Sequence, residues 1–90
     1  MCTYVTVNTE VSGSGKGPGQ SWRDLTTATV YFDHPVHAMA GHTLNIDFAM
    51  SGTGSGERIA LELTADSARR LVAAIEGALA EVPADLLASG

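Results

Sequence analysis

Four segments of the chain alternate apolar and polar residues with a period of two, and this pattern constrains the fold more than any other feature. The segments span residues 4–11, 26–32, 42–50 and 58–64. A period of two places every second side chain on the same face of a strand, so each segment predicts a half-buried β-strand. Short connections favour antiparallel pairing of consecutive strands, because a parallel pair needs a long crossover.

The last third of the chain changes to the periodicity of an amphipathic helix. Its apolar residues recur at spacings of three and four and are Ala68, Leu71, Val72, Ile75, Leu79 and Val82. Thr64 or Asp66 can cap the start of this helix, and Pro83 ends it. We therefore predict one α+β domain over residues 1–90, a four-stranded antiparallel β-meander with one C-terminal α-helix packed on one face.

The predicted sheet has one apolar face and one polar face. The side chains expected to face the helix are Val5, Val7, Val30, Phe32, Leu44, Ile46, Phe48, Ile59, Leu61 and Leu63. Four strands span about 15–19 Å whereas a helix is about 10 Å wide, so one helix leaves part of this face uncovered. Either the tail at Leu86 and Leu87 or a second chain fills the gap. We predict a homodimer, because twofold dimers are the commonest oligomers.

Length and charge disfavour several classes of function. A chain of 90 residues has room for one core only. Its net charge of -5 disfavours a nucleic-acid groove, which needs clustered cations. The apolar runs are too short for a membrane span, and no secretory leader is expected at the start. Cys2 cannot form a disulfide within the chain, which favours a reducing compartment, so we predict a cytoplasmic protein.

Two glycine clusters, Gly13–Gly19 and Gly52–Gly56, suggest a phosphate-binding loop at first sight. A Walker loop needs Gly-Lys-Ser/Thr opening a helix, whereas Gly17 follows Lys16 here and the next element is a strand. We therefore interpret both clusters as exposed hairpin loops. Lys16 swinging onto an acidic ligand is the functional alternative.

The histidines and the cysteine are expected at one edge of the sheet. In a meander, the start of the first strand meets the connection between the second and third strands. That edge holds Cys2, His34, His37 and His42. Imidazole and thiolate are ligands of zinc, copper, nickel and iron, so we predict a candidate site for a divalent transition metal or another ligand. The alternative is that the histidines are solvated, because their spacing matches no diagnostic metal motif.

The same edge allows a catalytic interpretation without metal. Cys2 beside an imidazole such as that of His34 could serve as a nucleophile, and Asp33 could orient the ring or act with it in acid–base or acyl chemistry. The structural alternative is that Cys2 is a small buried apolar residue.

The polar face supplies a third set of candidates. Asp47 shares this face with Tyr4 and Tyr31, and Trp22 follows the first glycine cluster, so the four residues are candidates for a small-molecule site. The same surface of tyrosines and threonines could instead dock a protein partner. A structural or interaction module is therefore the third hypothesis, beside a metal or ligand site and a small enzyme.

Four stretches of the sequence resemble those of a known protein family. They are Met1-Cys-Thr-Tyr-Val-Thr6, Val11-Ser-Gly-Ser-Gly-Lys-Gly17, Ala28-Thr-Val-Tyr-Phe-Asp-His-Pro-Val-His-Ala38 and His42-Thr-Leu-Asn-Ile-Asp-Phe48. With them, nearly the whole chain resembles a family of short actinobacterial proteins that is known as a domain of unknown function. The resemblance implies an actinobacterial cytoplasmic protein. It assigns no substrate, cofactor or catalytic residue.

Overall fold

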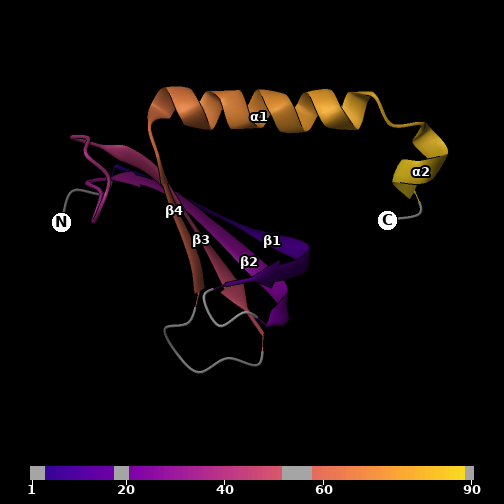
Figure 1. Ribbon diagram of the computed structural model, residues 1–90, viewed down its shortest axis with the longest axis horizontal. Helices are drawn as coiled ribbons and strands as arrows, with labels where there is room; N and C mark the ends of the chain where they lie inside the picture. Colours follow the sequence, from indigo (N-terminus) through magenta and orange to yellow (C-terminus); the bar gives the residue numbers. More distant parts are fainter. Residues whose placement is uncertain (1–3, 18–20, 52–57, 89–90) are drawn as a thin grey trace.

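The computed structural model describes residues 4–17, 21–51 and 58–88, and it confirms the predicted α+β meander. The four strands pair in sequence order, every pair antiparallel, and two helices follow them (Figure 1). The elements are β1 (Val5–Lys16), β2 (Trp22–Asp33), β3 (Thr43–Met50), β4 (Arg58–Leu63), α1 (Ala65–Ala80) and α2 (Ala84–Ala88).

The register of the strands confirms the two predicted faces. One row of Cα partners crosses the sheet through Val7, Val30, Ile46 and Leu61. The neighbouring row passes through Asn8, Thr29, Asp47 and Ala60. Because partners in a row point to the same side, the first row belongs to the apolar face and the second to the polar face.

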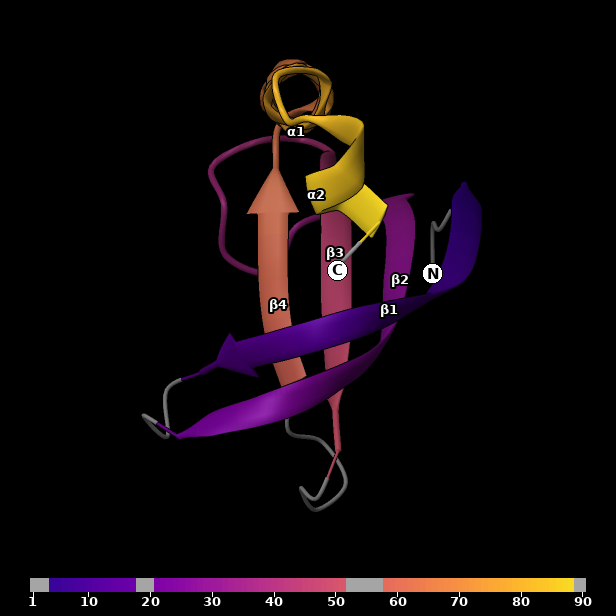
Figure 2. The same cartoon turned by 90° about the vertical axis from the view of Figure 1, so that its right-hand side faces the viewer.

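The β1–β2 hairpin is longer than the alternation predicts, and it curls over the apolar face (Figure 2). Register shifts lie between Glu10 and Gly13 in β1 and between Leu25 and Thr27 in β2, and such irregularities increase local twist. Most of the first glycine cluster is therefore strand, not loop. Its residues 18–20 and the second cluster, residues 52–57, lie outside the described part of the chain.

Gly15 is buried where the curled hairpin meets the apolar face. A Cβ atom at this position would lie 2.8 Å from Ile59 Cδ1 and 3.0 Å from Leu25 Cδ2. Glycine is the residue that permits this close approach of the backbone.

Replacing Gly15 by valine is expected to lower the free energy of unfolding by about 1–3 kcal/mol, because the new side chain overpacks the contact with Ile59. Urea unfolding measures the loss. Gly13→Val is the matched control on the same strand, since a Cβ at Gly13 meets nothing within 4 Å. Equal losses in the two variants would show that the contact of Gly15 is not the cause.

Helix α1 begins directly after β4 and then diverges from the sheet. Thr64 is the cap, because its Oγ1 accepts a hydrogen bond from the backbone N–H of Ser67 at 3.2 Å. The helix contacts β3 and β4 near its start, and its later turns extend past the sheet (Figure 1). Sheet and helix thus form the two walls of a wedge. No helix of the described residues is long and apolar enough to cross a membrane.

The apolar surfaces of sheet and helix stay largely exposed within one chain. The accessible surface is 6608 Å², whereas a compact protein of this mass exposes about 5,000 Å². The radius of gyration is 14.8 Å, against about 12 Å for a compact domain of this length. The tail does not fill the gap, since Leu86 and Leu87 are 58% and 48% exposed.

Candidate functional site

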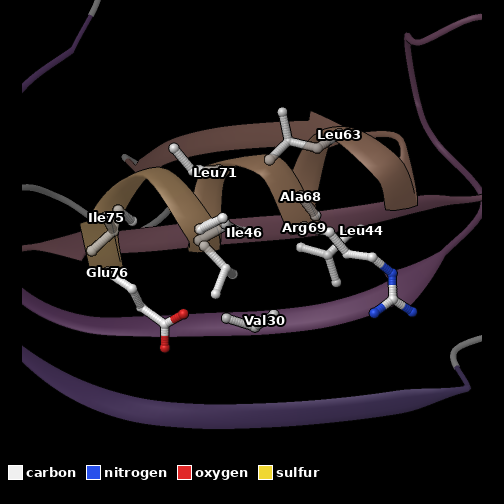
Figure 3. Close-up of a pocket in the computed structure, with 11 residues that line it drawn as sticks. Val30, Leu44, Ile46, Leu63, Ala68, Arg69, Leu71, Ile75 and Glu76 are labelled. Atoms are coloured by element: carbon white, nitrogen blue, oxygen red, sulfur yellow. The ribbon is translucent and has the colours of Figure 1, made fainter. Parts of the chain in front are cut away.

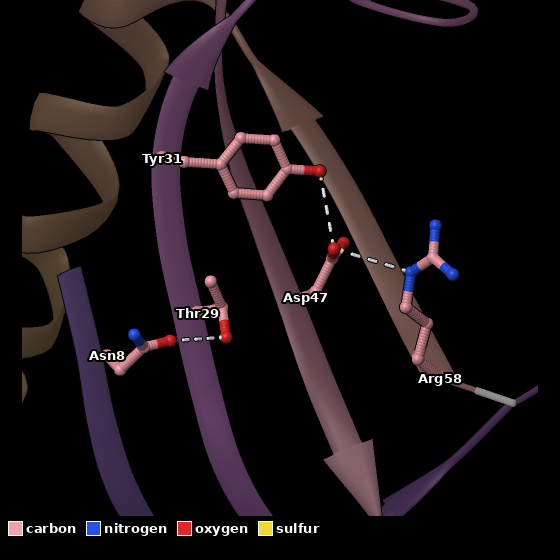
Figure 4. A network of polar contacts seen from close by, with 5 residues as sticks. All are labelled: Asn8, Thr29, Tyr31, Asp47 and Arg58. Carbon is pink, nitrogen blue, oxygen red and sulfur yellow. Dashed lines mark hydrogen bonds and ion pairs between the residues drawn. The ribbon is translucent and has the colours of Figure 1, made fainter. Parts of the chain in front are cut away.

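A polar network joins three strands on the polar face (Figure 4). Tyr31 Oη donates to Asp47 Oδ2 at 3.2 Å, and Arg58 Nε lies 3.4 Å from the same oxygen. Beside them, Thr29 Oγ1 donates to Asn8 Oδ1 at 2.7 Å. Burial and the adjacent Asp47 carboxylate raise the pKa of Tyr31, so its hydroxyl stays a proton donor at neutral pH. Of the predicted ligand residues, Tyr31 and Asp47 therefore lie together.

Tyr4 and Trp22 do not join this network. Tyr4 Oη lies 3.3 Å from His42 Nε2, and the Tyr4 ring centroid is 6.2 Å from that of Phe32, a residue of the apolar face. Tyr4 precedes the first residue of β1, so strand alternation does not fix the direction of its ring. Trp22 lies at the other end of the hairpin, where the Lys16 ammonium is 5.4 Å from its ring centroid. The four predicted ligand residues thus occupy three separate places.

Two of the three histidines come together at the predicted edge. The rings of His34 and His42 stack with centroids 4.5 Å apart, and His34 Nδ1 lies 3.0 Å from the Gly41 carbonyl oxygen. Within residues 4–17, 21–51 and 58–88, no three His, Cys, Asp or Glu side chains form a group that could hold a metal ion. His37 therefore does not complete a site with the other two histidines. Cys2, the fourth predicted ligand, lies outside the described residues.

The predicted catalytic residues are only partly described. Asp33 Oδ1 accepts a hydrogen bond from the backbone N–H of His34 at 2.6 Å. This contact lies at the start of the loop between β2 and β3. The nucleophile of the set, Cys2, is not among the described residues, so the combination of Cys2, Asp33 and His34 stays a prediction.

Glu62 holds the loop between β2 and β3 against the polar face. Its carboxylate oxygens accept hydrogen bonds from the backbone N–H groups of Val36, His37 and Ala38 at 2.5, 3.0 and 2.8 Å. These N–H groups lower the pKa of Glu62. Sequence reasoning missed this role, because no local pattern links Glu62 to backbone groups 24 to 26 positions away.

Replacing Glu62 by glutamine is expected to reduce the loss of stability in acid. The pKa of Glu62 is lowered in the folded chain, so its contribution is complete above the unfolded value of 4.5 and disappears as the pH falls through the folded value. Thermal unfolding from pH 7 to pH 3 measures the dependence, with Glu10→Gln, an exposed residue of the same face, as the control. An unchanged acid dependence in Glu62→Gln would contradict this role.

A groove of about 600 Å³ lies between α1 and the apolar face of the sheet (Figure 3). Its apolar walls are Val30, Leu44, Ile46 and Leu63 from the sheet and Ala68, Leu71, Val72, Ala73 and Ile75 from the helix. Arg69 and Glu76 stand at its two ends. A smaller hollow of about 310 Å³ adjoins the start of α1. The sequence signal for this site was the gap that one helix leaves on a four-stranded sheet.

Comparison with known proteins places the chain in a family without assigning it a role. A family model described as a family of unknown function (DUF6295) matches residues 1–88. The chain belongs to this family. The predicted resemblance to a domain of unknown function is thereby confirmed, and it transfers no substrate or catalytic residue. No curated protein and no solved structure matches the chain significantly.

Proposed function

We propose that this chain is one half of a homodimeric interaction module, in which a second copy covers the apolar groove. The observation that carries the proposal is the exposure of the apolar stripe of α1. Val72, Ile75 and Leu79 are 55%, 51% and 52% exposed, and Leu71 is 40% exposed. Monomeric proteins rarely expose continuous apolar patches of more than a few hundred Å².

The exposed area suits a permanent dimer in size. The chain exposes about 1,600 Å² more than a compact monomer of its mass. Covering this excess on two chains buries roughly 3,200 Å² in total, which lies within the range of obligate homodimers. The sequence allows either the tail at Leu86 and Leu87 or a second chain to cover the apolar face. Because both leucines are largely exposed, the second chain is the better candidate.

The polar face stays free for a ligand or partner in such a dimer. Tyr31 and Arg58 present donor groups around the Asp47 carboxylate. A small polar ligand at this network, in a cytoplasmic protein, is therefore the second candidate function. Titration of polar metabolites against Asp47→Asn and the unaltered protein tests it, and equal responses would exclude this site.

The dimer itself is tested by the dependence of thermal stability on protein concentration. Folding and association are coupled when the monomer lacks a core, so the midpoint of unfolding should rise as the protein is concentrated. We expect a steady rise from micromolar to millimolar chain concentration. A midpoint that does not depend on concentration would contradict the proposal.

A further inference from the structure

We infer that the second copy fills the groove with its own α1, running antiparallel, so that Arg69 of each chain lies opposite the partner's Glu76. This inference rests on the proposed homodimer and specifies how its two chains meet. Three features support it: a strip of side chains along α1, the charges in that strip, and the hollow at the start of the helix.

One strip of α1 contains both charged residues of the groove. Its members follow at steps of four and three residues and are Ala65, Arg69, Val72, Glu76 and Leu79. Arg69, Val72 and Glu76 line the groove itself, and Ala65 lines the smaller hollow. Steps of four and three residues align side chains along one face of a helix and are the spacing by which helices pack on each other.

The charges of this strip fix the direction of the partner helix. Arg69 and Glu76 lie two turns apart, about 10 Å along the axis, and point toward opposite ends of the groove (Figure 3). Neither forms an ion pair within the described part of the chain. A twofold axis between Val72 and Ala73 brings each Arg69 to the partner's Glu76. A parallel pair would instead place like charges side by side, which is unfavourable.

The same axis accounts for the half of α1 that extends past its own sheet. With this axis, Leu79 lies beside the start of the partner helix. There each chain has the hollow of about 310 Å³ lined by Phe32, Leu44, Ala65, Ala68 and Arg69, which is apolar enough to receive the partner's Leu79. Each helix would then cover its own sheet with its first half and the partner's sheet with its second half.

Charge reversal tests this arrangement. Arg69→Glu and Glu76→Arg should each raise the dimer dissociation constant about tenfold or more, because each creates two like-charge contacts across the twofold axis. The double variant should return to within about threefold of the unaltered protein. Arg70→Glu is the matched control, since Arg70 does not line the groove, and it should change the constant less than about threefold. Sedimentation equilibrium measures all four.

The outcomes separate this inference from the dimer itself. If the charge reversals leave the dimer dissociation constant unchanged, or if the double variant does not restore it, the antiparallel pairing is wrong. The homodimer itself is not contradicted by that result. An unaltered protein that is a monomer overturns both. Disulfide formation gives an independent readout in a Cys2→Ser background: Val72→Cys should cross-link the dimer. Leu79→Cys should not, because antiparallel packing separates the two copies of this residue by about 20 Å along the axis, whereas parallel packing would join them.

Discussion

Replacing Leu79 by lysine should dissociate the proposed dimer and lower the free energy of unfolding by about 2–5 kcal/mol. Leu79 is 52% exposed in one chain, and the proposed interface buries it. Truncating a buried leucine costs about this much, and a buried unpaired charge adds to the loss. Sedimentation velocity and urea unfolding at matched chain concentration measure the two effects.

The choice of lysine makes this result informative. In an isolated chain, a lysine in the last turn of α1 meets the negative end of the helix and an acidic protein, so its effect on stability would be neutral or slightly favourable. Ala74→Lys on the same helix is the control, because Ala74 lies outside the groove and is exposed. A Leu79→Lys protein that keeps the stability and mass of the unaltered protein would contradict burial of Leu79.

Replacing Ile46 by aspartate is expected to prevent folding. Ile46 lies on the central strand β3, in the row of apolar partners with Val30 and Leu61, and it forms part of the groove wall. A carboxylate there would lie among apolar side chains of the sheet and α1, and a buried polar group without a partner costs several kcal/mol, which is comparable with the total stability of many small domains.

The opposite face of β3 supplies the control for this substitution. Ala49→Asp adds the same carboxylate to the same strand, but on the polar face and at an exposed position, so the circular dichroism spectrum and the unfolding midpoint should stay close to those of the unaltered protein. If Ile46→Asp also folds with a normal midpoint, then the apolar face is not part of a core.

The fold was predictable because local patterns determine it. Alternation at Leu44, Ile46 and Phe48 assigned the faces of β3, and Thr64 was recognisable as a helix cap. The length of the β1–β2 hairpin was not predictable in this way. Gly15 interrupts the alternation, and only the position of Ile59 on a distant strand shows why a glycine is buried there.

The candidate site was less predictable, because it depends on side-chain direction and long-range contacts. Tyr31 and Asp47 were assigned to one face and meet there, whereas Tyr4 precedes the first paired residue and turns toward His42. Glu62 binds a loop that is remote in sequence, and nothing near it signals that contact. From the sequence, the groove was predictable only by comparing the width of one helix with that of four strands. That comparison shows that part of the apolar face is uncovered, but it does not identify the partner that covers it.

The mass of the protein in solution tests the central claim most directly. Sedimentation equilibrium of the unaltered protein, at chain concentrations from about 1 µM to 100 µM, should give twice the chain mass of 9.3 kDa over most of this range. A folded protein that sediments with the mass of a single chain throughout would contradict the account, because one chain leaves the groove beside α1 uncovered.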